Sequence, residues 1–136
     1  MTVWRETDPE VLAGLYAAVS EQYTVAEIIE GYGLTTVEAW LEWCKGSFVF
    51  AVSADNIVRG FVALRPVGCP GHWELHACRI NGLAFGDACR VLEQMLATVQ
   101  GWVHAWPIDG NAGARAALAI CGFTEVESGH YAKAAG

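Results

Sequence analysis

Three consecutive stretches in the middle of the chain have the composition of β-strands, and they constrain the fold more than any other feature. SFVFAVSA (47–54) and IVRGFVALRPV (57–67) are rich in β-branched and aromatic residues, and the turn dipeptide Asp55-Asn56 separates them. HWELHACR (72–79) follows a Pro-Gly turn and alternates with a period of two. The first two stretches predict an antiparallel hairpin, and the third adds another strand.

Helical patterns lie on both sides of these strands. Asp8-Pro9 opens the first helix, because an acidic N-cap followed by proline is a common helix start. Helical spacing predicts helices from Pro9 to about Val19, from Val25 to Glu30, from Thr36 to Cys44, between Gly82 and Gly101, and from Ala112 to Ile120. Further short strands are predicted at Thr2 to Glu6, in WVHAWPI (102–108), at Phe123 to Val126 and at His130 to Lys133.

The coarse order of these elements predicts the fold class. With the two or three helices before the hairpin counted as two, it is β, α, α, β, β, β, α, β, α, β, β. It is typical of an α+β domain in which helices cover both faces of a central sheet. The chain has 136 residues, which is enough for one hydrophobic core but too few for two. We therefore expect residues 1–136 to form a single domain.

Composition argues against several classes of function. The net charge is -7 and the chain has no basic run, so we expect no nucleic-acid partner. No apolar run reaches the roughly eighteen residues that a membrane span needs, and the first residues do not resemble a secretory signal. We therefore expect no membrane contact and a cytoplasmic location. The five cysteines are scattered without a CxxC pair, which is typical of small buried residues rather than of a disulfide framework.

Three side chains able to bind a metal or move a proton follow at two-residue spacing: His72, Glu74 and His76. Alternate residues of a strand point to the same face, so the three line one side of the predicted strand. A zinc site would need further ligands, such as Cys69 or Cys78. In an acid/base site, Glu74 or His76 would take a proton from an amine, directly or through water. The third interpretation is an ordinary polar strand face, and this segment alone does not decide between them.

Two motifs further along the chain add context. Arg79 to Ala84 has the form R-x-x-G-x-A at a junction of strand and helix, where backbone N–H groups and the helix dipole attract phosphate. Asn111 and Ala114 then precede Gly122-Phe123 in an N-x-x-A pattern that ends in G-F. In these motifs and in its element order, the chain resembles the GNAT superfamily of acyl-CoA-dependent N-acetyltransferases. Its WELH segment further resembles small GNAT-like proteins of tailed bacteriophages.

The resemblance implies acetyl-CoA as co-substrate and an amine of a small molecule or a protein as acceptor. The fourth strand, His72 to Cys78, and the fifth, Val103 to Ile108, would splay apart around the pantetheine arm. Glu74 or His76 would be the base for direct attack on the thioester, with a main-chain N–H polarising the carbonyl. No metal is expected. The resemblance assigns these residues to coenzyme A: Leu75, Ala77 and Cys78 on the strand, Arg79, Asn81, Gly82, Leu83 and Ala84 in the loop, and Asn111 beyond it.

One departure from the family pattern suggests a second interpretation. Seven residues after Asn111 the family often has a tyrosine that protonates the leaving thiolate, and this chain has Leu118 there. Neither Cys121 nor Tyr131 has the spacing to replace it. The alternative is a catalytically inactive GNAT-like protein that acts in an assembly, as a homo-oligomer or as a component of a phage virion.

The tryptophans, six in all, fit either interpretation. Tryptophan is enriched at protein interfaces, which favours a role in an assembly. The simpler prediction is that these residues fill the hydrophobic core. It applies to Trp40, Trp43, Trp73, Trp102 and Trp106.

Overall fold

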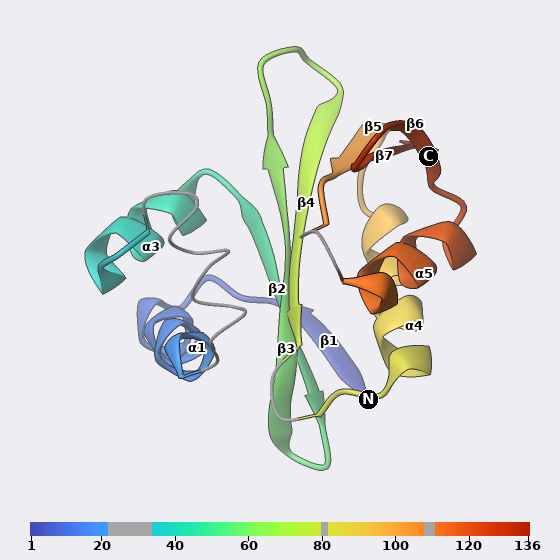
Figure 1. The fold of residues 1–136 in the computed structure, drawn as a ribbon. Coiled ribbons are helices and arrows are strands. Elements are labelled where there is room, and N and C mark those ends of the chain that lie inside the picture. The colour runs from blue at the N-terminus through green and yellow to red at the C-terminus, as the bar shows by residue number, and fades with distance from the viewer. Residues whose placement is uncertain (22–33, 80–81, 108–110) are drawn as a thin grey trace.

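One mixed sheet organises the chain, whose computed structural model describes residues 1–21, 34–79, 82–107 and 111–136 (Figure 1). The strand order is β1-β2-β3-β4-β5-β7-β6, and neighbouring strands are antiparallel except for β4 and β5. The strands are β1 (Thr2–Arg5), β2 (Phe48–Ala54), β3 (Ile57–Pro66), β4 (His72–Arg79), β5 (Gly101–Ala105), β6 (Thr124–Glu127) and β7 (His130–Ala135). The described helices are α1 (Pro9–Ser20), α3 (Val37–Lys45), α4 (Phe85–Leu96) and α5 (Ala112–Ile120). The predicted α+β class is confirmed.

The central hairpin forms as its sequence predicts. Asp55 and Asn56 have φ angles of 55° and 60°, the left-handed conformation that a tight two-residue hairpin turn requires. β4 then pairs antiparallel with β3, with Arg65 opposite Glu74. The three predicted strands are therefore consecutive neighbours in the sheet.

Two predicted elements have a different outcome. The helix expected from Val25 to Glu30 lies outside the described residues. The bounds predicted for the fifth strand, which reached Ile108, were wrong, because β5 spans Gly101–Ala105. Pro107 accounts for the early end, since proline has no N–H for a strand ladder and restricts the residue before it.

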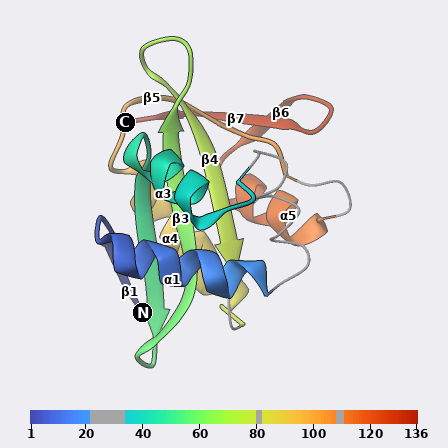
Figure 2. The ribbon, with the colours of Figure 1, turned by 90° about the vertical axis from the view of Figure 1, so that its left-hand side faces the viewer.

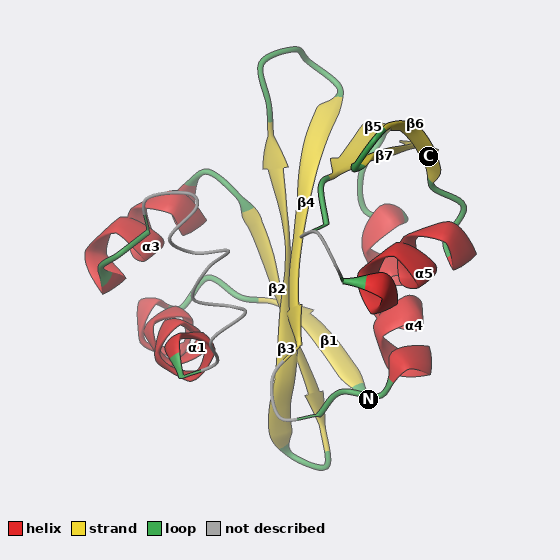
Figure 3. Cartoon of the chain, viewed as in Figure 1, coloured by secondary structure: helices red, strands yellow, loops and turns green. Residues whose placement is uncertain are grey.

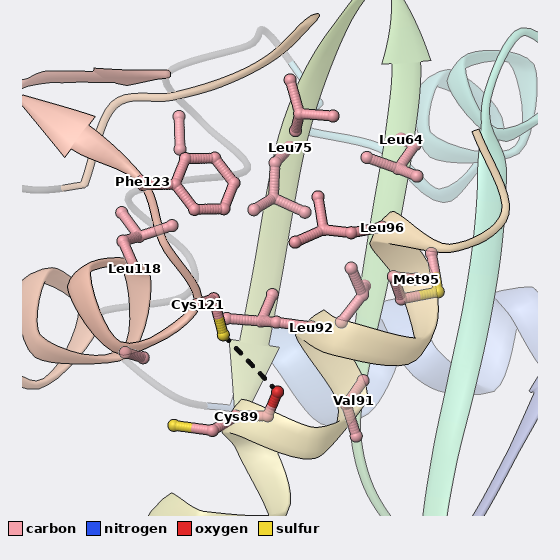
Figure 4. Packing of buried hydrophobic residues seen from close by; sticks show 14 of the residues in the cluster. Leu64, Leu75, Cys89, Val91, Leu92, Met95, Leu96, Leu118, Cys121 and Phe123 are labelled. Carbon is pink, nitrogen blue, oxygen red and sulfur yellow. Dashed lines mark hydrogen bonds between the residues drawn. The ribbon is translucent and has the colours of Figure 1, made fainter. Parts of the chain in front are cut away.

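The helices form a layer on each face of the sheet (Figures 1 and 3). Figure 2 looks onto the face that carries α1 and α3, which lie over β2, β3 and β4 but not over β6 and β7. The other face carries α4 and α5, whose apolar side chains pack with β4 and β5 in the cluster shown in Figure 4. Within the described residues, no helix is both long and apolar enough to cross a bilayer.

The tryptophans divide between core and surface. Trp40 is 2% exposed, stacks on Trp43 at 5.5 Å between ring centroids, and donates its indole N–H to the carbonyl oxygen of Leu12 at 2.8 Å. The prediction that these two residues belong to the core is thus confirmed. It was wrong for Trp102 and Trp106, which are 48% and 51% exposed. A period of two shows which residues share a face of the sheet, but not which part of that face a helix covers.

The parallel pairing of β4 with β5 is short. It joins His72–Glu74 to Trp102–His104, and neither strand pairs with the other beyond Glu74 and His104 in the described chain. β4 nevertheless continues to Arg79 against β3. The two strands therefore part after Glu74, which is the predicted splay.

A contact between two glycines fixes where β5 begins. The N–H of Trp102 donates to the carbonyl oxygen of Gly71 at 2.7 Å. A Cβ atom on Gly101, whose φ is +115°, would lie 1.9 Å from that oxygen. Only glycine permits this approach, so Gly101 sets the register of β5 against β4.

Gly101→Ala should destabilise the fold more than Gly129→Ala. Both glycines have positive φ, but an added Cβ at Gly129 would meet nothing within 4 Å. Alanine at Gly129 bears the conformational cost alone, whereas at Gly101 the clash should remove a further ~1–3 kcal/mol from the free energy of unfolding. Urea unfolding of both variants measures the difference. If the two variants lost the same free energy of unfolding, the close contact between Gly71 and Gly101 would not fix the start of β5.

Candidate active site

Glu74 and His76 form a hydrogen-bonded pair on β4. Nε2 of His76 donates to Oε1 of Glu74 at 2.6 Å, and the two side chains are 8% and 18% exposed respectively. An ionised carboxylate can only accept, so this bond places the proton of a neutral His76 on Nε2. The imidazole thereby holds the orientation of the carboxylate.

The carboxylate stands where the two central strands part. Glu74 is the last residue of β4 that pairs with β5, and its partner there is His104. The next residues of β4, from Leu75 onward, have a strand neighbour only on the β3 side among the described elements. A carboxylate able to accept a proton thus lies next to main-chain groups that have no β5 partner among the described residues.

Residues of α3 and β3 enclose His76. Its ring packs edge-on against Trp43, with the centroids 5.4 Å apart, and the guanidinium of Arg65 lies 5.7 Å from the centroid of the same indole. Burial lowers the pKa of His76, and the charge of Arg65 lowers it further, whereas the hydrogen bond and charge of Glu74 act in the opposite direction. The net lowering keeps the imidazole neutral at neutral pH.

The loop after β4 leads into α4 through Gly82, Leu83 and Ala84. Gly82 is exposed at φ +76°, and an added Cβ there would meet nothing within 4 Å. Leu83 is 5% exposed and its side chain belongs to the core, so only its backbone could face a ligand. Arg79 ends β4, while its side chain and Asn81 lie outside what the structure describes.

The start of α4 differs from the starts of the other described helices. Side chains of the N-cap residues accept a first-turn N–H in α1, α3 and α5, and these caps are Asp8, Thr36 and Asn111. The N-cap of α4 is Ala84, whose side chain cannot accept a hydrogen bond. Uncapped N–H groups and the helix dipole make such an end favourable for an anion.

Asn111 and Leu118 have evident structural roles. Oδ1 of Asn111 accepts the N–H of Ala114 at 3.0 Å, which explains the N-x-x-A spacing as a helix cap. Leu118 is 5% exposed and packs in the same cluster as Leu75 and Leu92 (Figure 4). Leu118, which stands where the resembled family often has a tyrosine, thus occupies a core position.

The groups considered as substitutes for that tyrosine are buried. The thiol of Cys121 donates to the carbonyl oxygen of Cys89 at 3.6 Å, and burial raises its pKa (Figure 4). Burial, followed by a hydrogen bond with Glu125, raises the pKa of Tyr131. Burial also raises the pKa of Cys78, to about 12. All three stay protonated at neutral pH.

No sequence pattern placed His104 and His130 beside the candidate base. Nδ1 of His72 lies 2.9 Å from Nε2 of His104, and Nδ1 of His104 lies 2.9 Å from Nε2 of His130. The three rings come from β4, β5 and β7, so their proximity depends on strand order and register that no local pattern contains. No group of three or more His, Cys, Asp or Glu side chains in the described ranges is arranged to hold a metal ion.

Solved structures share this architecture. The aminoglycoside 6′-N-acetyltransferase from Enterococcus faecium aligns with a TM-score of 0.72 at 15% identity, over 98% of this chain and 97% of that one. The acetyltransferase AAC(6′)-Ib, solved with ribostamycin and coenzyme A, aligns with a TM-score of 0.73 at 13% identity, over 98% and 92% of the two chains. A structure from Desulfovibrio desulfuricans described as a GNAT-family acetyltransferase aligns with a TM-score of 0.65 at 13% identity, over 98% of both chains.

This chain has the GNAT fold. The predicted fold class, including the splayed strands, is therefore confirmed. Sequence comparison does not assign a family, because neither a family model nor a curated protein sequence matches the chain. In the GNAT fold of this protein, Glu74 and His76 lie on β4 at the point where it separates from β5.

His76→Gln should weaken the pH dependence of stability. The pKa of His76 is lowered below its ordinary 6.5, so the unfolded chain binds more protons and stability falls as the pH drops below 6.5. Glutamine can still donate to Glu74 but does not titrate. The free energy of unfolding, measured by urea denaturation from pH 7.5 downward, should fall less steeply in the variant. Because the pKa of His104 is also lowered, the variant should keep part of this dependence of stability on pH. The same dependence in variant and wild type would contradict a buried, neutral His76.

Proposed function

We propose that this protein transfers an acyl group from coenzyme A to an amine. The observation that carries the proposal is the position of the Glu74–His76 pair at the point where β4 and β5 part. A general base must lie within reach of the proton that it removes, and a thioester bound along the unpaired edge of β4 would lie beside Glu74. The GNAT fold of the chain supports this assignment.

Coenzyme A would bind along β4 and at the start of α4. The main-chain groups of Leu75 to Cys78 that have no β5 partner in the described part of the chain would meet the pantetheine amides, and one of their N–H groups would polarise the thioester carbonyl. The uncapped start of α4, with Gly82 and Ala84 before it, would receive the pyrophosphate. Arg79 and Asn81 are proposed to complete this loop, with Asn111 on the opposite wall. Three of the similar structures contain coenzyme A.

Glu74 is the proposed base and His76 its positioning residue. The substrate enters as an ammonium ion and loses one proton to Glu74, after which the amine attacks the carbonyl carbon. The N–C bond forms, the C–S bond breaks, and the second proton of the nitrogen ends on the thiolate. Each turnover therefore releases one proton to solvent in total.

The leaving thiolate has no dedicated acid in this account. Leu118 has no proton to give, and Cys121 and Tyr131 lie in the core beneath α4 and α5. A thiolate is a tolerable leaving group without prior protonation, so the reaction does not require the missing tyrosine. We expect its absence to reduce the rate rather than to abolish it.

A cationic small molecule is the proposed acceptor. Similar structures were solved with kanamycin or ribostamycin beside coenzyme A, and both ligands carry several amines. The net charge of -7 on this chain favours encounter with such cations. An amine of a protein is the alternative acceptor.

An inactive role in an assembly, such as a tailed-phage virion, is the second candidate. Leu118 in the core and the exposed Trp102 and Trp106 favour it. The two candidates differ in one observable. Only the enzyme releases free coenzyme A thiol from acetyl-CoA in the presence of an amine.

Glu74→Gln should lower kcat about a hundredfold or more, because the amide cannot accept the proton. A chromogenic thiol reagent measures coenzyme A release with kanamycin, ribostamycin or a lysine peptide as acceptor. The affinity for acetyl-CoA, measured by calorimetry, should change by less than about twofold, because the general-base role acts on the rate and not on thioester binding. Glu42→Gln, at an exposed site on α3, is the matched control. Equal rates for the two variants would exclude Glu74 as the base.

Gly82→Asp should weaken coenzyme A binding about tenfold, since a carboxylate at the start of α4 repels the pyrophosphate. Gly129→Asp adds the same charge at a similar backbone conformation, φ +79° against +76°, with nothing within 4 Å of the added Cβ at either site. The control should bind as the wild type does in calorimetry. Similar dissociation constants for the two variants would remove α4 from the proposed binding site.

A further inference from the structure

A row of three imidazoles crosses the sheet beside the proposed base. His72, His104 and His130 belong to β4, β5 and β7, and successive ring nitrogens lie 2.9 Å apart. The three residues share one face with Glu74, because Glu74 pairs with His104 and Ala132 of β7 pairs with His104 from the other side. The proposed acyl transfer leaves this row without a role.

The two contacts restrict the tautomers of the row. A neutral imidazole has one N–H donor and one acceptor nitrogen. If Nδ1–H of His72 donates to His104, then His104 must carry its own proton on Nδ1 and donate to His130. The opposite direction requires the proton on Nε2 in all three rings. A neutral row therefore exists in two states, which differ by the movement of one proton across each contact.

Ring contacts hold the row in place. The rings of His72 and His104 lie nearly in one plane, with centroids 5.2 Å apart and planes at 13°, as a hydrogen bond between their nitrogens requires. The indole of Trp106 stacks on His130 at 4.5 Å and lies 5.9 Å from His104. This gives the exposed Trp106 a specific function, because it fixes the orientation of the rings whose nitrogens must stay in contact.

The charges around the row favour a neutral His104. Burial lowers its pKa, and the neighbouring His130 and His72 lower it further, whereas Glu74 raises it. Glu127 of β6 lies opposite His130 in register. Two adjacent imidazolium rings would each present only donors and would lose their contact, so a row with at most one extra proton is the stable form.

We propose that this row carries the proton released by acyl transfer from Glu74 to solvent. This role rests on the proposed function, which releases one proton per turnover. Nε2 of His72 accepts the proton from Glu74, directly or through water. The proton on Nδ1 of His72 then moves to Nε2 of His104, and the proton on Nδ1 of His104 moves to Nε2 of His130. Nδ1–H of His130 finally gives up its proton to solvent. The row passes from the Nδ1–H to the Nε2–H tautomer. Each ring returns to the first state by exchange with water, which gives a proton to its Nδ1 and takes the proton from its Nε2. No oxidant, metal or further reactant is required.

Nitrogen NMR tests the row without any substrate. In uniformly ¹⁵N-labelled protein at neutral pH, the three rings should have the same tautomer, and N–N couplings should connect His72 to His104 and His104 to His130. His104→Phe should abolish both couplings while the ring stack keeps the fold intact. Mixed tautomers, or neutral rings without couplings, would overturn the proposal.

Kinetics of coenzyme A release test its role as a relay. In dilute buffer, His104→Phe should lower kcat about tenfold with little change in KM, and added imidazole buffer should restore the rate, because external buffer then removes the proton. Trp102→Phe, on the same strand and face but outside the row, should behave as the wild type in any buffer. A loss that imidazole does not restore would indicate a structural effect and overturn the relay.

The outcomes also separate the relay from the function on which it rests. Turnover by the wild type with full activity of His104→Phe would overturn the relay alone. Intact N–N couplings without turnover of any amine would overturn the proposed acyl transfer, and the relay would lose its role with it.

Discussion

In the described residues, the parallel ladder between β4 and β5 joins only His72–Glu74 to Trp102–His104, and the surroundings of Glu74 depend on where it stops. The contact of Gly71 with Gly101 and Trp102 sets its register, and β3 keeps β4 extended after β5 has turned away. Main-chain polar groups need partners, and a strand that loses its neighbour on one edge offers them to a ligand. The same separation that exposes this edge places a carboxylate beside it.

The two faces of the sheet carry different kinds of side chains around β4 and β5. Leu75, Leu118 and Tyr131 point into the apolar cluster under α4 and α5, so that face is committed to packing. The opposite face holds Glu74 against His76 and the three linked imidazoles of β4, β5 and β7. The proposed proton transfers would therefore all take place on one face of the sheet.

Local signals made much of this fold predictable. The Asp8 cap and the Asp55-Asn56 turn depend on residues close to them in the sequence, and alternation in β4 placed Glu74 and His76 on one face. The imidazole row was not predictable, because it depends on the register of β5 against both β4 and β7, and these strands lie far apart in the sequence. Exposure of Trp102 and Trp106 was missed for a related reason: periodicity tells which residues share a face, but not which part of that face a helix covers.

The most direct test of the central claim is a titration of ¹⁵N-labelled protein with coenzyme A, followed by backbone amide shifts. If the diverging strands hold the pantetheine arm, saturable shifts should be largest for Leu75 to Cys78 and for the start of α4, from Gly82 to Asp87. Amides of β1 and α3 should not move. The absence of saturable shifts, or shifts confined to elements away from β4 and α4, would contradict the account.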